Sequence, residues 1–269
     1  MDQVSATVSC EWLHDNQNLE HLIILDASVG SDTVCSNEWI PNSRYFDIKG
    51  KFSDVFAEFP NTIPSREQFE KEACELGINN ESLIIVYDNK GVYWSPRVWW
   101  LFKTFGFDNV AVLDGGLPQW KKLHYETVST LNSKGWHVGN FKTNYQADRV
   151  CYFHQILTIS RDENCIILDA RSEERFKKIA PEPRLGLRSG TIPNSMSLPY
   201  INLLNEYCLK PKAELKVIFN TLKIGDRSLT FSCGSGITAC ILLLAAEIVG
   251  YKKLSVYDGS WTEFGTLTK

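Results

Sequence analysis

The stretch SLTFSCGSGITACILLLAAEIVG, residues 228–250, contains the three patterns that decide the fold. SLTFS is a short β-branched and apolar run typical of a strand, and GSGIT is a glycine-rich turn. ACILLLAAEIV then has the Ala, Leu and Ile content that favours a helix. A strand that passes through a tight turn into a helix is the building unit of parallel α/β sheets, so the stretch predicts a strand that leads into Cys233 and then a helix.

The same succession of patterns occurs twice in the chain. Three pairs of segments correspond in the same order: LIILDAS (22–28) with CIILDARS (165–172), WIPNSRYFDI (39–48) with TIPNSMSLPY (191–200), and LIIVYDNKGVYWSPRVWWLFKTFGFDNVAVLDGG (83–116) with SLTFSCGSGITACILLLAAEIVGYKKLSVYDGS (228–260). Such a repeat indicates two copies of one structural unit. Because each copy alternates strand-like runs with helical stretches, we expect the α/β fold class, with two domains that each contain a parallel sheet flanked by helices.

The length of 269 residues agrees with two domains that each bury a core of their own. We expect the first domain at residues 1–125 and the second at residues 151–269. Residues 126–150 are polar and have no sustained periodicity, which is typical of a linker on the surface.

The composition excludes several classes of protein. Hydrophobic residues make up 43% of the chain and charged residues 22%, as in ordinary soluble globular proteins. The net charge of −4 comes without a basic block, so we expect no nucleic-acid partner. The longest apolar run, around residues 241–249, is too short to cross a bilayer, and the N-terminus has no signal or transit pattern. We therefore expect a cytoplasmic protein that has no membrane partner.

The cysteines and histidines do not follow a metal-binding pattern. Eight cysteines, at positions 10, 35, 74, 151, 165, 208, 233 and 240, include no CxxC pair, and the five histidines include no HxxxH. Zinc sites and disulfide frameworks need such spacings, so we expect free thiols and no metal or organic cofactor. A reactive cysteine must then be identified by its surroundings.

Cys233 has such surroundings. The glycines of GSG permit turns in which successive backbone N–H groups point inward, and the start of the helix adds a dipole that favours negative charge. These groups stabilise a thiolate, which is the nucleophilic form of cysteine. The alternative is a cysteine packed in the core. Phosphatases that use cysteine place an arginine at the end of this loop, and Ala239 at that position argues against phosphate chemistry.

The segment CGSGITAC resembles the active-site loop of the 3-mercaptopyruvate sulfurtransferases, within the tandem-rhodanese superfamily. Further motifs agree in order and cover nearly the whole chain: YWSPRVWWLFKTFG and LDGGLPQW in the first half, and DARSEERF, EPRLGLRSGTIPNS and YDGSW in the second. The resemblance implies that Cys233 takes a sulfur atom from a donor, becomes a persulfide and passes the sulfur to a thiol or to cyanide. The backbone of the loop would cradle the persulfide anion, with contributions from Gly234, Gly236, Ile237 and Thr238.

The resemblance also indicates the donor. Related enzymes that use thiosulfate carry basic side chains in this loop, whereas Gly234, Ser235 and Gly236 are uncharged, which favours the monoanion 3-mercaptopyruvate and the release of pyruvate. The family binds the donor carboxylate with two arginines, which correspond to Arg175 and Arg184.

Three further residues are weaker candidates. Arg188 lies in the same segment as the two arginines, the Ser235 hydroxyl could polarise the donor carbonyl or pass a proton, and Tyr93 could reach the substrate from the first domain. Each candidate has a simpler alternative. The arginines could be solvated surface residues, Ser235 a small turn residue, and Tyr93 a packing residue.

Two positions depart from the relay of some family members, and a third differs between the two halves of this chain. Some members complete a Ser/His/Asp relay with residues of the first domain, but the aspartate corresponds to Lys49 and the histidine to Asn61. The proton then comes from water or from Ser235, or the donor is a different one. Asp88 replaces the cysteine in the first half, and because a carboxylate cannot carry sulfur we expect that domain to be catalytically inactive.

We therefore predict a sulfurtransferase that moves sulfur from 3-mercaptopyruvate through a Cys233 persulfide. The acceptor would be cyanide or a thiol, such as a reduced thioredoxin-like protein or a small thiol. Two alternatives stay open. One is a thiosulfate:cyanide sulfurtransferase, and the other is a carrier that relays persulfide sulfur toward tRNA thiolation or cofactor synthesis.

Overall fold

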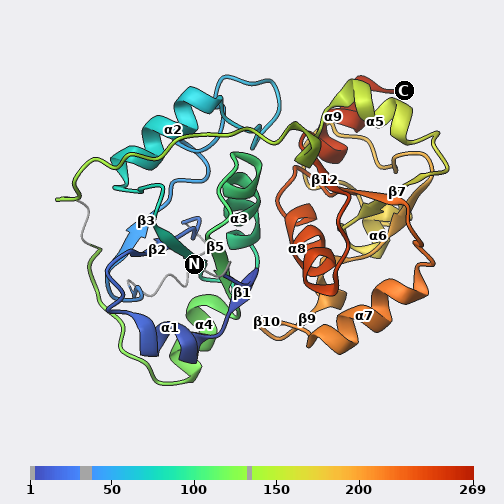
Figure 1. Ribbon diagram of the computed structural model, residues 1–269. Coiled ribbons are helices and arrows are strands. Elements are labelled where there is room, and N and C mark those ends of the chain that lie inside the picture. The colour runs from blue at the N-terminus through green and yellow to red at the C-terminus, as the bar shows by residue number, and fades with distance from the viewer. Residues whose placement is uncertain (1–3, 31–37, 132–134) are drawn as a thin grey trace. The chain divides into compact units, whose positions relative to one another are not determined.

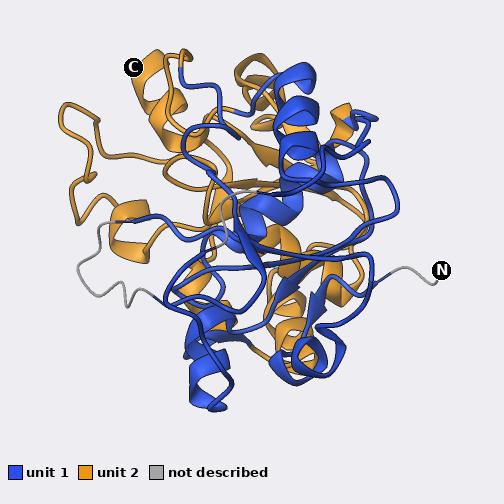
Figure 2. Ribbon diagram, turned by 90° about the vertical axis from the view of Figure 1, so that its left-hand side faces the viewer, with its two compact units in different colours: residues 1–55, 63–146, 205–209 blue, residues 56–62, 147–204, 210–269 orange. Residues whose placement is uncertain are grey.

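The computed structural model describes residues 4–30, 38–131 and 135–269, which fall into two compact units. Unit 1 consists of residues 1–55, 63–146 and 205–209, and unit 2 of residues 56–62, 147–204 and 210–269 (Figure 2). The two units therefore exchange short segments of sequence. Residues 56–62 come from the first half of the chain but belong to unit 2, and residues 205–209 come from the second half but belong to unit 1. Cys35 lies outside the described residues.

Unit 1 contains a parallel five-stranded sheet in the order β1-β5-β4-β2-β3 (Figure 1). Its elements are β1 (Thr7–Val8), α1 (Cys10–Asn16), β2 (Leu22–Asp26), β3 (Ser43–Tyr45), α2 (Arg66–Glu75), β4 (Leu83–Tyr87), α3 (Ser95–Thr104), β5 (Val110–Leu113) and α4 (Gly116–Lys122). The central strand β4 has the sequence LIIVY, and its residues 84–87 are buried. A continuous apolar run is what a parallel strand covered on both faces requires.

Unit 2 repeats this arrangement, with a parallel sheet in the order β6-β12-β11-β7-β8 (Figure 1). Its elements are η1 (Ala147–Arg149), β6 (Val150–Cys151), α5 (Phe153–Ile159), β7 (Cys165–Asp169), α6 (Glu173–Phe176), β8 (Ser195–Ser197), η2 (Tyr200–Leu203), α7 (Lys212–Thr221), β11 (Ser228–Ser232), α8 (Ala239–Val249), β12 (Leu254–Tyr257) and α9 (Ser260–Leu267). Between η2 and α7 the chain forms two short strands, β9 (Leu204–Asn205) and β10 (Cys208–Leu209). The predicted α/β fold, with two parallel sheets flanked by helices, is confirmed.

Serine side chains begin several of the helices. Ser9, Ser65 and Ser172 precede α1, α2 and α6, and each hydroxyl accepts a hydrogen bond from a backbone N–H in the first turn of its helix. Serine is favoured at this position because those N–H groups have no partner within the helix. The bond before α6 comes from the N–H of Arg175, so the cap also holds the backbone of a predicted site residue.

The helices that follow the central strands are the most deeply buried. Every residue of α3 is buried, as are residues 239–246 of α8. The α8 helix packs against β11, β12 and α7, which explains why ACILLLAA has no polar face. None of the helices formed by the described residues is long and apolar enough to cross a membrane.

The strand register places the turn after β11 at one edge of the sheet. Asp169 at the end of β7 pairs with Ser232 at the end of β11, so both strands finish side by side. Cys233 is the next residue after β11 and thus lies at the carboxyl edge of the sheet. Parallel α/β sheets bind their ligands at this edge.

Candidate active site

The turn at residues 233–238 joins β11 to α8, as the sequence predicts. Cys233 is only 2% exposed, and it lies between a central strand and a buried helix. Gly236 has a φ of +78°, in the left-handed region that glycine adopts without strain. The turn therefore holds its cysteine in a rigid setting and requires a glycine three positions later.

Ser260 holds this turn from inside the unit. Its hydroxyl oxygen accepts hydrogen bonds from the backbone N–H groups of Cys233 and Gly236, each at 3.1 Å, and donates to the carbonyl of Tyr257 at 2.9 Å. The Oγ atom lies 4.0 Å from Sγ of Cys233. Ser260 itself has a φ of +52°, which is uncommon for a residue other than glycine. Sequence reasoning missed this residue, although the repeat aligns it with Gly116.

The start of α9 adds two backbone contacts to the same turn. The N–H of Trp261 donates to the carbonyl of Cys233 at 3.0 Å, and the N–H of Thr262 donates to the carbonyl of Gly234 at 2.9 Å. With its carbonyl oxygens tied to α9, the turn keeps the N–H groups of Ile237 and Thr238 at the start of α8, where no described residue accepts from them. Unpaired N–H groups at a helix start attract an anion.

The equivalent turn in unit 1 holds an anion of its own. Asp88 occupies the position of Cys233, and its Oδ2 atom accepts from the backbone N–H groups of Tyr93, Trp94 and Ser95, each at 2.9 Å. The Ser95 hydroxyl donates to the same oxygen at 2.7 Å. The Asp88 carboxylate therefore fills the anion site that this turn forms, which explains how the first copy keeps the turn without a cysteine.

Arg175 lies beside the turn of unit 2. A side chain at position 234 would place its Cβ atom 3.1 Å from Nη2 of Arg175, so the guanidinium packs against Gly234. The same nitrogen donates to Oε2 of the buried Glu182 at 2.6 Å, and Oε1 of Glu182 accepts from Arg171 at 2.7 Å. Nε of Arg175 is buried and has no hydrogen-bond partner among the described residues. This donor suits an anion bound at the turn.

The other two arginines of the segment are placed differently. Arg184 is exposed, and no hydrogen bond or ion pair between described side chains joins it to the turn. Arg188 donates from Nε to the carbonyls of Gly265 and Thr268, and its guanidinium carbon lies 4.8 Å from the ring centroid of Trp261. Arg188 is thus tied to α9, and of the three arginines Arg175 is the one brought to the turn.

Ser235 and Asn61 are in contact within unit 2. Nδ2 of Asn61 lies 2.9 Å from the Ser235 hydroxyl and 3.0 Å from the Ser235 carbonyl. Lys49 and Tyr93 belong to unit 1, where the Lys49 ammonium lies 4.9 Å from the centroid of a Trp94 ring and Tyr93 packs edge-on against the same residue at 5.0 Å. The role of Tyr93 in substrate binding stays a prediction.

Three other thiols are poor candidates for the nucleophile. Burial raises the pKa of Cys10 and of Cys151 to about 12, and that of Cys208 to about 11. These thiols stay protonated at neutral pH, and a protonated thiol is not nucleophilic. Cys240 is fully buried in α8, with Sγ 3.3 Å from the carbonyl of Gly236. The described residues also include no group of His, Cys, Asp or Glu that could hold a metal ion.

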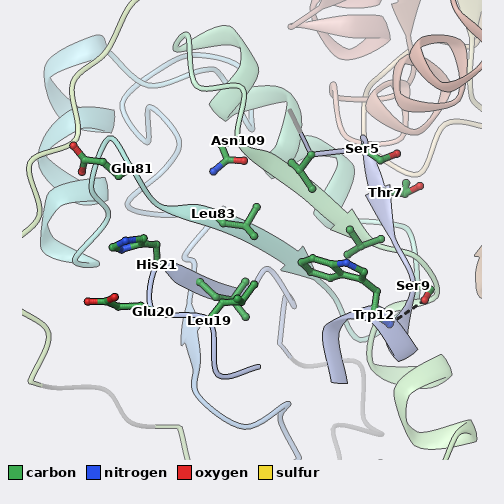
Figure 3. A pocket seen from close by; sticks show the side chains of 13 residues that line it. Ser5, Thr7, Ser9, Trp12, Leu19, Glu20, His21, Glu81, Leu83 and Asn109 are labelled. Atoms are coloured by element: carbon green, nitrogen blue, oxygen red, sulfur yellow. Dashed lines mark hydrogen bonds between the residues drawn. The ribbon is translucent and has the colours of Figure 1, made fainter. Parts of the chain in front are cut away.

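Unit 1 has a separate groove of about 840 Å³ (Figure 3). Trp12 forms part of its wall, together with Leu22 and Leu83, the first residues of β2 and β4. The groove thus lies at the amino ends of these strands, away from the edge at which Asp88 follows β4. No cysteine or arginine lines it, so it lacks the groups that sulfur transfer from an anionic donor requires.

Comparison with known protein families agrees with the internal repeat. The family model described as Rhodanese-like domain matches residues 9–123 and residues 154–266, once in each half of the chain.

Curated relatives align over almost the whole chain. The chain is 36% identical over 287 residues to thiosulfate/3-mercaptopyruvate sulfurtransferase 1, mitochondrial, from Arabidopsis thaliana, covering 96% of this chain and 76% of the relative. It is 33% identical over 270 residues to 3-mercaptopyruvate sulfurtransferase from Escherichia coli strain K12, covering 96% of this chain and 94% of that protein.

A solved structure has the same fold. The crystal structure of SseA from Escherichia coli, a 3-mercaptopyruvate sulfotransferase, matches with a TM-score of 0.83 at 30% sequence identity, covering 96% of this chain and 99% of that chain.

Proposed function

The chain belongs to the rhodanese family in both of its halves and is an enzyme of the sulfurtransferase type, and from this premise we propose that it transfers sulfur from 3-mercaptopyruvate through a persulfide on Cys233. The observation that carries the proposal is the pair of equivalent turns. Asp88 in unit 1 has three backbone N–H groups on one carboxylate oxygen, so the turn is built to bind an anion. In unit 2 the same turn carries the thiol of Cys233, and the anion it would bind is a thiolate or a persulfide.

The proposed reaction moves one sulfur atom and two electrons. The Cys233 thiolate attacks the sulfur of 3-mercaptopyruvate, a sulfur–sulfur bond forms, and the carbon–sulfur bond breaks with its electron pair passing into the enolate of pyruvate. The cysteine sulfur is oxidised and the donor carbon is reduced. The enolate takes a proton from water to give pyruvate, and the thiol proton of the donor leaves the persulfide. A thiol or cyanide then removes the outer sulfur and regenerates the thiolate.

Arg175 is the proposed contact for the donor carboxylate. Its guanidinium lies against the turn and has a buried Nε without a partner among the described residues, whereas residues 234–238 carry no charge. One positive group suits one carboxylate. Arg184 stays a proposed second contact for the donor carboxylate. To make this contact, the exposed loop that carries Arg184 must approach the bound donor.

One experiment tests the central claim. The protein is mixed with 3-mercaptopyruvate, pyruvate release is measured, and intact mass spectrometry detects added sulfur. We expect the parent protein and the control Cys165→Ser to gain one sulfur atom and release pyruvate, and Cys233→Ser to do neither. Pyruvate release by Cys233→Ser at the parental rate would overturn the mechanism.

A second pair of variants tests donor recognition. We expect Arg175→Ala to raise KM for 3-mercaptopyruvate by tenfold or more, about the contribution of a hydrogen bond to a charged group. Arg188→Ala is the matched control because its guanidinium is held by α9, and it should leave KM unchanged. Equal KM values for Arg175→Ala and the parent would exclude Arg175 as the carboxylate contact.

Thiosulfate is the alternative donor, because one relative is named for both donors. Replacing 3-mercaptopyruvate by thiosulfate in the same mass measurement separates the two, and we expect faster loading from 3-mercaptopyruvate. A carrier that is loaded by a partner protein would take sulfur from neither donor. We propose a thiol as the physiological acceptor and a cytoplasmic location, although the Arabidopsis relative is named as mitochondrial.

A further inference from the structure

The side-chain amide of Asn61 is hydrogen-bonded to Ser235, which lies two residues after the proposed nucleophile Cys233. Asn61 lies in the segment 56–62 that belongs to unit 2, and it is 6% exposed. Its Nδ2 atom is 3.0 Å from the carbonyl oxygen of Ser235 and 2.9 Å from the hydroxyl oxygen of the same residue. One amide group therefore holds both the backbone and the side chain of Ser235.

The carbonyl contact establishes which end of the amide faces Ser235. A backbone carbonyl oxygen only accepts hydrogen bonds, so the atom 3.0 Å from it must be the –NH₂ group rather than the amide oxygen. The same –NH₂ group then donates to the Ser235 hydroxyl oxygen. Since a serine hydroxyl has one hydrogen and two lone pairs, this bond occupies a lone pair and leaves the O–H free to donate elsewhere.

We propose that Asn61 is a positioning residue that makes Ser235 a hydrogen-bond donor to the carbonyl oxygen of the sulfur donor. The inference rests on the proposed function. When the Cys233 thiolate takes the donor sulfur, the electron pair of the broken carbon–sulfur bond places negative charge on that carbonyl oxygen. The Ser235 O–H stabilises the resulting enolate by a hydrogen bond that strengthens as the charge develops. A carboxamide neither gives nor takes a proton, so Ser235 acts without a relay and the carbon is protonated by water.

The ionisable groups around the turn do not replace such a relay. They include Cys233 itself, Arg175 with Glu182 behind it, and, on the side of α9 and the segment 56–62, the carboxylates of Asp258, Glu263 and Glu58. No histidine is among these described groups. The one histidine of unit 2 is His154 in α5, whose exposed ring stacks on Tyr152.

Substitutions at Asn61 can reverse the direction of the hydrogen bond without changing the backbone. Asn61 has a φ of +63°, and Asn, Asp and His are the residues other than glycine that are enriched in this region. Asn61→Asp only accepts, so it draws the Ser235 O–H toward itself and away from the substrate. Asn61→Ala removes the bond. Asn61→His donates to Ser235 when protonated and can accept from it when neutral.

The test is single-turnover pyruvate release by the full-length protein with 3-mercaptopyruvate, over a range of pH. We expect Asn61→Ala to be about tenfold slower than the parent, the size of one hydrogen bond, and Asn61→Asp slower still, each by a factor that does not change with pH around neutrality. For Asn61→His we expect the rate relative to the parent to fall in one step as the pH rises through the pKa of histidine, about 6.5. Dividing by the parental rate removes every pH effect that the variant shares with the parent.

The matched control is Asn194→Asp. Asn194 also has a left-handed backbone, with a φ of +57°, and also donates from Nδ2 to a backbone carbonyl of unit 2, that of Ser160 at 2.7 Å. This variant should transfer sulfur at the parental rate. Parental rates for Asn61→Asp and Asn61→Ala, or a relative rate of Asn61→His that is constant with pH, would overturn the inference while leaving the proposed function intact. If the parent itself gains no sulfur, the proposed function fails instead. If Asn61→Asp does not fold, the pH dependence of Asn61→His decides alone.

Discussion

The hydroxyl oxygen of Ser260 lies 3.1 Å from the backbone nitrogen of Cys233 and accepts its hydrogen bond, so the first residue of α9 supports the backbone of the nucleophile. The same oxygen accepts from Gly236. We expect Ser260→Ala to leave both buried N–H groups without an acceptor and to lower the free energy of unfolding by about 2–4 kcal/mol. Single-turnover loading of sulfur on Cys233 should slow as well, because the turn loses its fixed geometry.

Two further variants separate the hydrogen bond from backbone strain. Ser260→Gly removes the hydroxyl but also the strain of a φ of +52°, and should be more stable than Ser260→Ala while remaining slow. Ser228→Ala, at the start of β11, is the control and should be close to the parent in both measurements. A Ser260→Ala protein with the stability and rate of the parent would show that the bond has no role.

In unit 1 the carboxylate of Asp88 should contribute to the stability of the fold and not to sulfur transfer. It accepts three backbone N–H groups and one hydroxyl on a single oxygen, and Asp88→Asn replaces part of that acceptor by an –NH₂ group. We expect Asp88→Asn to lower the free energy of unfolding by about 1.5–3 kcal/mol, the range for hydrogen bonds to a charged group. Urea unfolding measures it. Asp15→Asn on the exposed side of α1 should change stability by less than about 0.5 kcal/mol, and an equal effect of both variants would contradict the prediction.

The sequence was sufficient to predict both sheets and the position of Cys233. Parallel strands covered on both faces are continuous apolar runs, and the repeat showed the same run before the turn at Asp88 and before the turn at Cys233. A local pattern was enough here because the strand, the turn and the start of the helix are consecutive in the chain.

The partners of the turn could not be predicted in the same way. Glu182 lies between the segments 165–172 and 191–200, a stretch that is longer than its counterpart between 22–28 and 39–48, so the repeat offers no guide to it. A buried acid between Arg171 and Arg175 arises only when the chain folds. Asn61 belongs by sequence to the first repeat and by packing to unit 2. The hydroxyl of Ser260 reaches the turn because α9 packs against it, which no local pattern records.

The buried Glu182 should position Arg175 and also stabilise unit 2. Its two oxygens pair with Arg175 and with the fully buried Arg171, so Glu182→Gln leaves Arg171 with Asp169 as its one remaining carboxylate and removes the carboxylate that Arg175 binds. We expect the free energy of unfolding to fall by about 1.5–3 kcal/mol, the range for a hydrogen bond to a charged group. Because Arg175 loses the carboxylate that orients it, KM for 3-mercaptopyruvate should rise more than kcat falls. The control is the exposed Glu174→Gln in α6, and an unchanged KM in folded Glu182→Gln would refute the positioning role.

The stability of unit 2 should depend on pH through Glu263 in α9. Burial, together with the nearby carboxylates of Asp258 and Glu58, raises the pKa of Glu263 in the folded state. A carboxyl with a raised folded pKa binds its proton more tightly in the folded protein than in the unfolded chain. Its contribution to stability is therefore fully present below the unfolded pKa of about 4.3 and is lost as the pH rises through the folded pKa.

Glu263→Gln removes this loss because glutamine does not ionise. Comparing urea unfolding of the parent and of Glu263→Gln at several pH values from about 4 to about 8, we expect the variant to gain stability relative to the parent as the pH rises. Glu263 is only partly buried, and solvent screening keeps the effect small. The control is Glu214→Gln, at an exposed position of α7, and the gain of Glu263→Gln should exceed that of this control. The raised pKa of Glu263 is refuted if Glu263→Gln gains no more stability with pH than Glu214→Gln, or if it loses stability relative to the parent at higher pH.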